Sequence, residues 1–326
     1  MHTGVSPMTV SRVLSGDANV KSETVQRVQA AIKRLGYTPN VAARNLARAA
    51  PTHIGLLYTN PSAAYLGELL AGVLEESTHA GCQLVLEKTG GRAERAGVAR
   101  LVKGGVGGVV LMSESKSLLQ ALRTAKVPCA VVAMGRAGMD GISVRINDFE
   151  AAAAMTRYLI SIGHRQIGFI AGPPTHISSS QRQEGFTAAM REAGVVVRPV
   201  WLAHGAFSYR SGLVAAERIL NAGQRPTAIF ASNDDMAAAT IAVANRLRID
   251  VPKELSVVGF DDTELATTIW PSLTTVRQPI AAMARKAVEL LLEEIRLRRL
   301  GQTQGSVQHV MNYSLVERES SAAILP

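Results

Sequence analysis

The stretch Leu255–Asp262, LSVVGFDD, is a short apolar run that ends in two aspartates. Runs of this kind are typical of parallel strands, because helices cover both faces of such a sheet. Similar runs, separated by amphipathic stretches, recur from residue 53 onward: HIGLLY, CQLVLE, GGVVLM, CAVVAM, QIGFIA, PVWLA and TAIFA. This alternation predicts an α/β fold built from doubly wound parallel sheets.

The number of strands predicts two lobes. Eight or more strand–helix units follow residue 52, which is more than one doubly wound sheet usually holds. The pattern ends with a long helix expected from Ile280 to Leu300 and a last strand expected near Val307–Val316.

Residues 1–50 carry helical patterns only. The first expected helix has Ser6 as its cap and Pro7 in its first turn, and its apolar face is formed by Val10, Val13 and Leu14. Ser22 is placed to cap a second helix, whose apolar face holds Val25, Val28, Ile32 and Leu35. A short segment, VAARNLARAA, follows and is stopped by Pro51.

The positive charge is concentrated in this helical segment. Seven Lys and Arg residues and two acidic residues lie in residues 1–50, so that the segment carries +5 of the net charge of +9. A basic head on a nearly balanced body favours a polyanionic partner.

The remaining composition favours a cytoplasmic protein. Cys82 and Cys129 lie in apolar runs and are interpreted as buried thiols in a reducing compartment. No apolar run approaches the roughly 18 residues of a membrane span, and residues 1–10 do not resemble a signal peptide. We therefore expect no contact with a membrane.

Motifs of common enzyme classes are missing from the sequence. The glycines of Gly104–Gly108 precede an expected strand, whereas a dinucleotide-binding loop follows one. There is no G-x-x-x-x-G-K-[ST] loop, no HExxH and no CxxC. We expect neither an enzyme nor a bound cofactor or metal.

An ordered series of motifs resembles the lactose- and purine-repressor family along essentially the whole chain. In the head these are GVS (4–6), TVSRVL (9–14), LGY (35–37) and PN (39–40), and in the body GHRQI (163–167), AGP (171–173), SND (232–234), SVVGFDD (256–262) and LTTVRQP (273–279). The resemblance implies a helix-turn-helix head over 1–38, a hinge helix over 39–50 and a two-lobed, periplasmic-binding-protein-like core over 51–326. Lobe 1 would comprise 52–148 and about 279–305, and lobe 2 would comprise 149–278 and about 306–318.

In such a head, the recognition helix lies in the major groove of DNA. Arg12 can donate two hydrogen bonds to guanine, and Leu46 matches the hinge leucine that enters the minor groove. The residues expected to contact DNA are Ser6, Pro7, Met8, Thr9, Ser11, Arg12, Asn40, Ala43 and Leu46. The family's first helix, which precedes Gly4, is missing from this sequence. Either the start codon has been placed too late, or the head has lost part of its small core, in which case we expect a loose head.

Small ligands of such cores bind at the carboxyl ends of the strands. Asn233 and Asp261 follow strands, Arg182 lies in the segment after another, and all three match effector-binding positions of the family. Their carboxylate, guanidinium and amide groups suit a vicinal diol. Phe207 matches an aromatic ligand contact, and Tyr65 and Asp148 are further candidates at the rim of the other lobe. Ser180 stands where many members carry an arginine, which disfavours an anionic effector.

These features together predict a homodimeric transcription regulator. It would bind a palindromic double-stranded operator, and a small effector of the carbohydrate class, bound between the lobes, would change its affinity for DNA. The alternative is a cytoplasmic sugar-binding protein with a degenerate DNA-binding head.

Overall fold

The chain divides into two units, Met1–Pro51 and Thr52–Pro326. The computed structural model describes Thr9, Val13 and residues 21–34, 52–58, 62–88, 94–112, 115–132 and 141–324. In the first unit, Thr9 and Val13 are helical, and helix α2 spans Ser22–Arg34 with Val28 buried. The rest of the expected first helix and the hinge over 39–50 lie outside the described residues.

The second unit contains two six-stranded sheets. Sheet 1 has the order β11-β5-β4-β3-β1-β2, and its pairings are all parallel. Its strands are β1 (His53–Tyr58), β2 (Gln83–Lys88), β3 (Val106–Leu111), β4 (Cys129–Val132), β5 (Ile142–Arg145) and β11 (Val307–Val310). Because the strands are parallel, all of them begin at one edge of the sheet and end at the other.

Sheet 2 has the order β12-β10-β9-β8-β6-β7. Its strands are β6 (Ile167–Ala171), β7 (Leu202–His204), β8 (Ala228–Ala231), β9 (Ser256–Asp261), β10 (Thr274–Arg277) and β12 (Ser314–Val316). Only β12 runs antiparallel to its neighbour. The two sheets confirm the predicted fold class.

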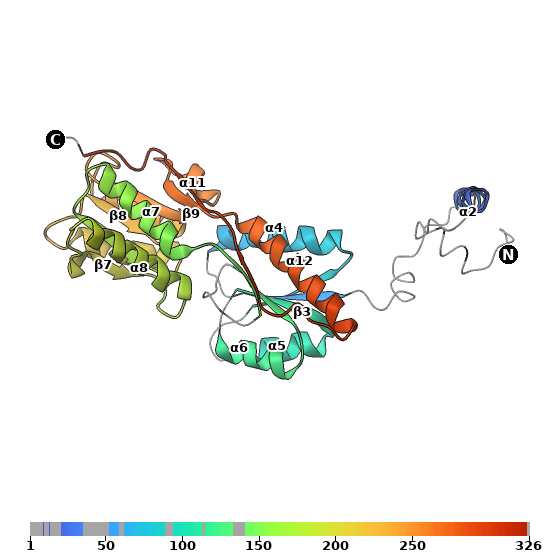
Figure 1. The fold of residues 1–326 in the computed structure, drawn as a ribbon. Helices are drawn as coiled ribbons and strands as arrows, with labels where there is room; N and C mark the ends of the chain where they lie inside the picture. The colour runs from blue at the N-terminus through green and yellow to red at the C-terminus, as the bar shows by residue number, and fades with distance from the viewer. Residues whose placement is uncertain are drawn as a thin grey trace. The chain divides into compact units, whose positions relative to one another are not determined.

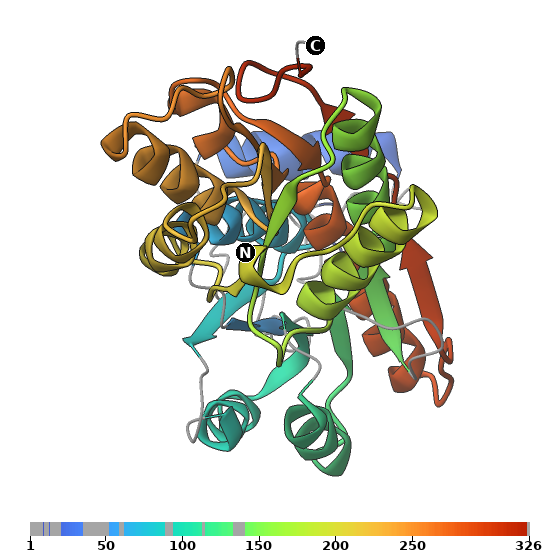
Figure 2. The ribbon, with the colours of Figure 1, turned by 90° about the vertical axis from the view of Figure 1, so that its left-hand side faces the viewer.

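Helices cover both faces of each sheet (Figures 1 and 2). In lobe 1, α4 packs beside α12 on one face, and α5 lies beside α6 on the other. These helices are α4 (Ala63–His79), α5 (Glu94–Lys103), α6 (Lys116–Thr124) and α12 (Ile280–Arg299). In lobe 2, α7 packs against α8 and α9 against α10. The helical elements of lobe 2 are α7 (Asp148–Ser161), α8 (Ile177–Glu192), η2 (Pro199–Trp201), α9 (Tyr209–Leu220), α10 (Asp234–Arg246) and α11 (Leu265–Thr268).

The end of the chain differs from the prediction. One strand was expected near Val307–Val316, within lobe 2, but β11 pairs with β5 of sheet 1 and β12 pairs with β10 of sheet 2. The assignment of residues 306–318 to lobe 2 was therefore wrong for β11. Both halves of this segment have strand character, and the change of sheet depends on pairing partners far away in sequence. The chain thus crosses between the lobes three times, after β5, β10 and β11.

The buried apolar side chains of the described residues form three clusters, and the largest of them extends through both lobes. One cluster of buried apolar side chains includes Leu56 of β1, Val276 of β10 and Phe260 of β9. Within lobe 2, the ring of Phe169 stacks on Phe186 with 4.7 Å between centroids. The long helix predicted from residue 280 is confirmed as α12.

The contact between α4 and α12 predicts that alanine at two glycines of α4 changes the free energy of unfolding in opposite directions. A Cβ on Gly72 would lie 2.2 Å from the carbonyl oxygen of Ala281, whereas a Cβ on Gly67 would meet no atom within 4 Å. Gly72→Ala should lower the free energy of unfolding by about 1–3 kcal/mol through overpacking. Gly67→Ala should raise it by roughly 0.5–1 kcal/mol, because alanine favours a helix over glycine. Urea titrations of both variants would measure the difference, and equal effects would contradict the close packing.

Candidate functional site

A buried ion pair in lobe 2 joins Arg182 to Asp148, so the expectation that Asp148 lies on the other lobe, opposite Arg182, was wrong. Asp148 is the first residue of α7, where the side chain of Asn147 caps the helix, and Arg182 lies on α8, which packs against α7. Arg182 Nε donates to Asp148 Oδ1 at 2.7 Å, and the two side chains are only 5% and 4% exposed. Burial raises the pKa of Asp148, and the nearby guanidinium of Arg182 opposes that shift.

Three further groups hold the guanidinium of Arg182. Its Nη1 donates to the carbonyl oxygen of Ser232 at 2.7 Å and lies 3.6 Å from Asp261 Oδ1. The plane of the group lies over the ring of Phe260, with Cζ 3.6 Å from the ring centroid, which is a cation–π contact. Arg182 therefore ties the beginning of α7 to the ends of β8 and β9.

Asp261 ends β9 with a backbone conformation that is uncommon for aspartate. Its φ is 121°, and that of Asp262 is 59°. Such strain persists only where the surroundings fix the geometry, and it is frequent at functional sites. Asp261 Oδ1 accepts a hydrogen bond of 2.6 Å from Gln278 Nε2. Burial raises the pKa of Asp261 well above its usual value, against the attraction of Arg182.

Asn233 and Phe207 lie beside this cluster and are bonded to each other. Asn233 caps α10 by accepting from the backbone N–H of Met236 at 3.1 Å, and its Nδ2 donates to the carbonyl oxygen of Phe207 at 3.1 Å. Phe207 has a φ of 56°. Its ring fits against Gly172, where a Cβ would lie 2.2 Å from the ring. The ring also lies 5.9 Å from the guanidinium carbon of Arg182.

Tyr65 reaches the same cluster from lobe 1. It lies in the first turn of α4 and is buried. Burial and the charge of Asp261 raise its pKa well above 10.0, while Arg182 opposes the shift. The structure therefore brings all six residues predicted for the effector site into one buried cluster at the ends of the strands. Of the residues predicted to contact DNA, only Thr9 is among those the structure describes.

A polar bridge joins the lobes next to the cluster. Ser62, the cap of α4 in lobe 1, donates to Asp235 Oδ2 of α10 in lobe 2 at 2.6 Å. The carboxylate of Asp235 thus faces the N-terminal end of α4, where the helix dipole favours a negative charge. Farther along α4, the charges of Asp262 and Glu264 raise the pKa of Glu68, after the larger effect of burial. The hydrogen bond of Ser62 therefore holds α4 to lobe 2, whereas the like charges around Glu68 oppose that approach.

Two structural residues of the site were not predicted. Asp234 is fully buried and accepts from Thr275 Oγ1 at 2.6 Å and from the backbone N–H of Thr263 at 2.8 Å. Burial raises its pKa to about 7, while these hydrogen bonds oppose the shift. The second residue that was not predicted is Gln278, which donates a hydrogen bond to Asp261. Gln278 belongs to the LTTVRQP motif and Asp234 to SND, but the motifs alone do not show which side chains these residues would contact.

The described part of the chain contains no cluster of three or more His, Cys, Asp or Glu residues that could hold a metal ion. None of its helices is both long and apolar enough to cross a bilayer. The cluster is instead rich in hydrogen-bond acceptors, with two carboxylates for one guanidinium. That guanidinium already donates to Asp148 and to the carbonyl oxygen of Ser232.

Comparisons with known proteins agree with this architecture. Residues 2–40 match the family "Bacterial regulatory proteins, lacI family", and residues 156–321 match "Periplasmic binding protein-like domain". The chain is 36% identical to the HTH-type transcriptional repressor PurR of Pectobacterium carotovorum, over 98% of this chain and 94% of the relative. The PurR repressor of Photorhabdus laumondii is 35% identical, over 90% and 88% of the two chains.

Solved structures of transcriptional regulators have the same fold. The lac repressor dimer bound to operator and the anti-inducer ONPF has a TM-score of 0.81 at 26% identity, with 99% of this chain and 97% of that chain covered. The complex of the transcriptional regulator CelR with cellobiose has a TM-score of 0.76 at 29% identity, with 98% and 97% covered. The present chain therefore belongs to the LacI family of bacterial regulatory proteins and is a DNA-binding transcriptional repressor, not an enzyme.

Proposed function

We propose that this repressor binds an uncharged, hydroxyl-rich effector of the carbohydrate class between its two lobes. The observation that carries the proposal is the buried group of Asp148, Arg182 and Asp261, in which carboxylates outnumber the guanidinium. Carboxylate oxygens accept hydrogen bonds, and sugar hydroxyls donate them. An anionic effector would meet two buried carboxylates and a guanidinium that is already paired.

The ring of Phe207 supports the same class of ligand. It lies beside Asn233, and the ring of His176 meets it edge-on with 5.6 Å between centroids. An apolar ring face next to polar acceptors matches a sugar, which has apolar C–H faces and polar edges. One solved relative, CelR, is a complex with cellobiose.

Control of DNA binding would follow from the bridge between the lobes. The hydrogen bond from Ser62 to Asp235 holds α4 near α10, and a ligand that contacts both Tyr65 and the lobe 2 cluster adds to that attraction. The ligand shifts the equilibrium between open and closed lobes by its difference in affinity for the two states. This change in the core alters the affinity of the head for a palindromic operator in the cytoplasm.

DNA contact is assigned to the head. Arg12 reads a guanine in the major groove, and Leu46 enters the minor groove between base pairs. Ser6, Pro7, Met8, Thr9 and Ser11 position the recognition helix, and Asn40 and Ala43 position the hinge. The match of residues 2–40 to the lacI family supports this assignment for the head.

The dimer surface is assigned to α4 and β2 of lobe 1. β2 is one of the two edge strands of sheet 1, and its Leu86 is 49% exposed. Leu74 of α4 is 55% exposed. Exposed leucines at a sheet edge are unfavourable in water and are typical of surfaces that pair with another chain. The lac repressor structure, of which this chain covers 97%, is described as a dimer.

Replacing one carboxylate should test the effector site. Asp261→Asn keeps the shape of the side chain and an acceptor for Gln278, but removes the charge and half of its accepting capacity. Affinity for the effector should fall by about tenfold or more, because an unmet buried hydrogen bond costs ~1–3 kcal/mol. Calorimetric titration against mono- and disaccharides, with purine bases as a competing class, would identify the ligand. Asp250→Asn, on the surface of lobe 2, is the control.

The pH profile of binding gives a second readout of the same variant. Burial raises the pKa of Asp148 and Asp261, so these groups gain protons at a higher pH than ordinary carboxyls do. The protonated carboxyl loses accepting capacity, and affinity should therefore be weaker near about pH 5 than near about pH 8. Asp261→Asn should flatten this dependence. An unchanged affinity in the variant, or binding of purines alone, would reject the proposed ligand class.

Two head variants should separate base reading from DNA bending. Arg12→Ala should relax the preference at one base pair of each half-site, since a bidentate arginine contributes ~1–3 kcal/mol of discrimination. Leu46→Ala should instead reduce bending and affinity with little change in base preference. Selection of binding sites from random DNA, followed by a gel-based bending assay, would measure both. Identical preferences in the Arg12 variant and the parent would show that Arg12 does not read bases.

A charge placed on β2 should test the dimer surface. Leu86→Glu would put carboxylates of two chains opposite each other and should shift the protein toward monomers in sedimentation velocity. Val196→Glu, in an irregular loop of lobe 2 where Val196 is 75% exposed, is the matched control and should leave the assembly unchanged. If Leu86→Glu sediments like the parent, the dimer forms through another surface.

A further inference from the structure

The side of Arg182 that suits a carboxylate is only half used by the protein itself. Arginine binds carboxylates through two parallel hydrogen bonds, and the neighbouring Nε and Nη2 groups offer this geometry. The exposed pair of Arg100 and Glu87 adopts it, with both N···O distances at 2.8 Å. Arg182 Nε donates to Asp148 Oδ1 at 2.7 Å, but in the described part of the chain no hydrogen bond from Nη2 accompanies it. Asp148 therefore takes one half of this side and leaves the other.

The other sides of this guanidinium are occupied. Nη1 donates to the carbonyl oxygen of Ser232 at 2.7 Å and lies 3.6 Å from Asp261 Oδ1. The ring of Phe260 covers one face of the group, with Cζ 3.6 Å from the ring centroid. An incoming carboxylate therefore has the side of Nε and Nη2 left to it, and there it competes with Asp148 for the same donors.

The charges around Arg182 oppose a second anion beside Asp148. Arg182 remains protonated: burial alone would lower its pKa, but the carboxylates of Asp148 and Asp261 raise that pKa above its ordinary value. All three side chains are almost fully buried. Charges interact strongly where water is excluded, so a carboxylate ligand would meet two negative charges for one positive charge. A neutral ligand avoids this repulsion.

Helix α7 does not need a carboxylate at position 148. Its cap is Asn147, whose Oδ1 accepts from the backbone N–H of Glu150 at 3.2 Å. The helix dipole favours a negative charge in the first turn, and the exposed Glu150 supplies one. An asparagine at position 148 would still offer an acceptor to Arg182 Nε. The charge of Asp148 is therefore not demanded by the helix that carries it.

We propose that Asp148 is a built-in carboxylate that sets the charge selectivity of the effector site. It occupies the place of a ligand carboxylate beside Arg182 and so restricts the site to neutral ligands. A ligand hydroxyl fits the remaining groups, because it can accept from Arg182 Nη2 and donate to a carboxylate oxygen of Asp148. Without Asp148, the same place takes a carboxylate. The ligand class rests on the proposed function, whereas the carboxylate site beside Arg182 does not.

Rescue of a truncated variant by a free carboxylate tests the site without any effector. Asp148→Ala removes the carboxylate and leaves a space beside Arg182 that formate can fill. Formate should raise the midpoint of thermal unfolding of this variant by about 1–3 °C relative to the same concentration of chloride, because a ligand of the folded state stabilises it. The parent protein should show no such difference. Glu150→Ala, which removes an exposed carboxylate from the same helix, is the matched control and should behave like the parent.

Charge selectivity itself is measured with pairs of sugars that differ by one carboxylate. The pairs are glucose with glucuronate and galactose with galacturonate. In calorimetric titrations, the parent should bind the neutral sugar of a pair about tenfold or more tightly than the uronate. Asp148→Asn should shift the ratio of the two affinities toward the uronate by about tenfold or more. Asp261→Asn should shift this ratio less, because Asp261 lies farther from Arg182 and binds Gln278.

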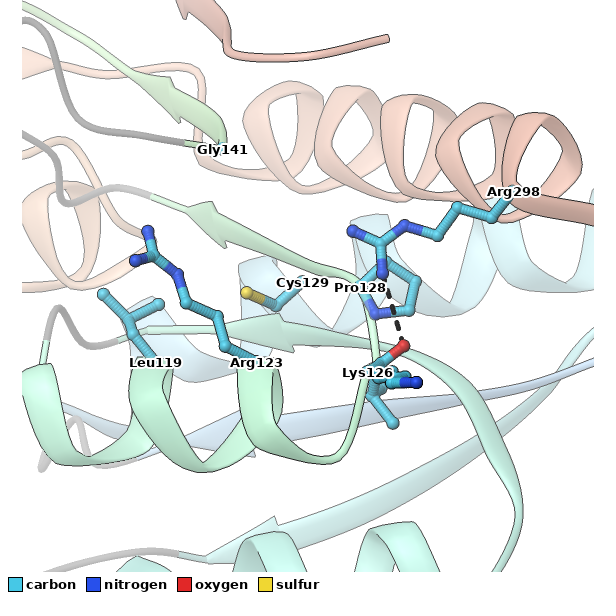
Figure 3. A pocket seen from close by; sticks show the side chains of 8 residues that line it. Leu119, Arg123, Lys126, Pro128, Cys129, Gly141 and Arg298 are labelled. Atoms are coloured by element: carbon cyan, nitrogen blue, oxygen red, sulfur yellow. Dashed lines mark hydrogen bonds between the residues drawn. The ribbon is translucent and has the colours of Figure 1, made fainter. Parts of the chain in front are cut away.

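Anions can also bind to cations outside the effector site, and a cavity in lobe 1 provides the control for that. It has a volume of about 470 Å³ and lies at the edge of sheet 1 where the strands begin. There Arg298 Nη1 donates to the carbonyl oxygen of Lys126 at 3.3 Å (Figure 3). Lys126→Asn, at a φ of 58° that asparagine tolerates, should leave the ratio of the two affinities unchanged.

Several results would overturn the proposal. Equal stabilisation by formate in Asp148→Ala and Glu150→Ala would show that no carboxylate site lies beside Arg182. If Asp148→Ala does not fold, the ratio in Asp148→Asn decides. An unchanged ratio there, or an equal shift in Asp261→Asn, would mean that Asp148 does not set the selectivity. A ratio that changes in Lys126→Asn would place uronate binding in the cavity of lobe 1. If the parent binds purine bases and no sugar, the proposed ligand class fails, while rescue by formate still decides the role of Asp148.

Discussion

The buried guanidinium of Arg182 is the constraint on which the geometry of the cluster depends. A buried charge is tolerated only when it is paired and its hydrogen bonds are satisfied. Arg182 meets this requirement with Asp148 at the start of α7, the carbonyl oxygen of Ser232 after β8, and Asp261 at the end of β9. Each partner belongs to a different element, so the position of one charged group fixes how three elements end or begin. Loss of one partner from such a pair generally costs about 3–5 kcal/mol.

Much of this arrangement could be predicted from the sequence, because parallel sheets place the ends of their strands together. LSVVGFDD and TAIFASND each show a buried strand followed at once by polar residues. Once the strands are recognised, Asp261 and Asn233 must lie at the same edge of sheet 2, which is what the structure shows. The other four residues of the cluster could be identified only through the resemblance to a family, since no local pattern marks them. They are Arg182, Phe207, Tyr65 and Asp148.

The contacts made by each residue could not be predicted, for two physical reasons. Hydrogen-bond partners such as Gln278 for Asp261, or Thr275 for Asp234, are neighbours only after β9 and β10 have paired in register. Strand character is also local, whereas the choice of sheet is not. For this reason the sequence predicts a single strand where the structure has β11 and β12. The chain passes from one lobe to the other in the residues that separate Val310 from Ser314.

The distribution of charge gives the two edges of sheet 1 different chemistry. At the edge where its strands end, Tyr65 and Ser62 of α4 face the carboxylates of Asp261 and Asp235 in lobe 2. At the edge where they begin, Arg123, Lys126 and Arg298 surround a cavity. The side chains of lobe 1 that face lobe 2 are therefore separated, along the length of the strands, from the cationic side chains around the cavity.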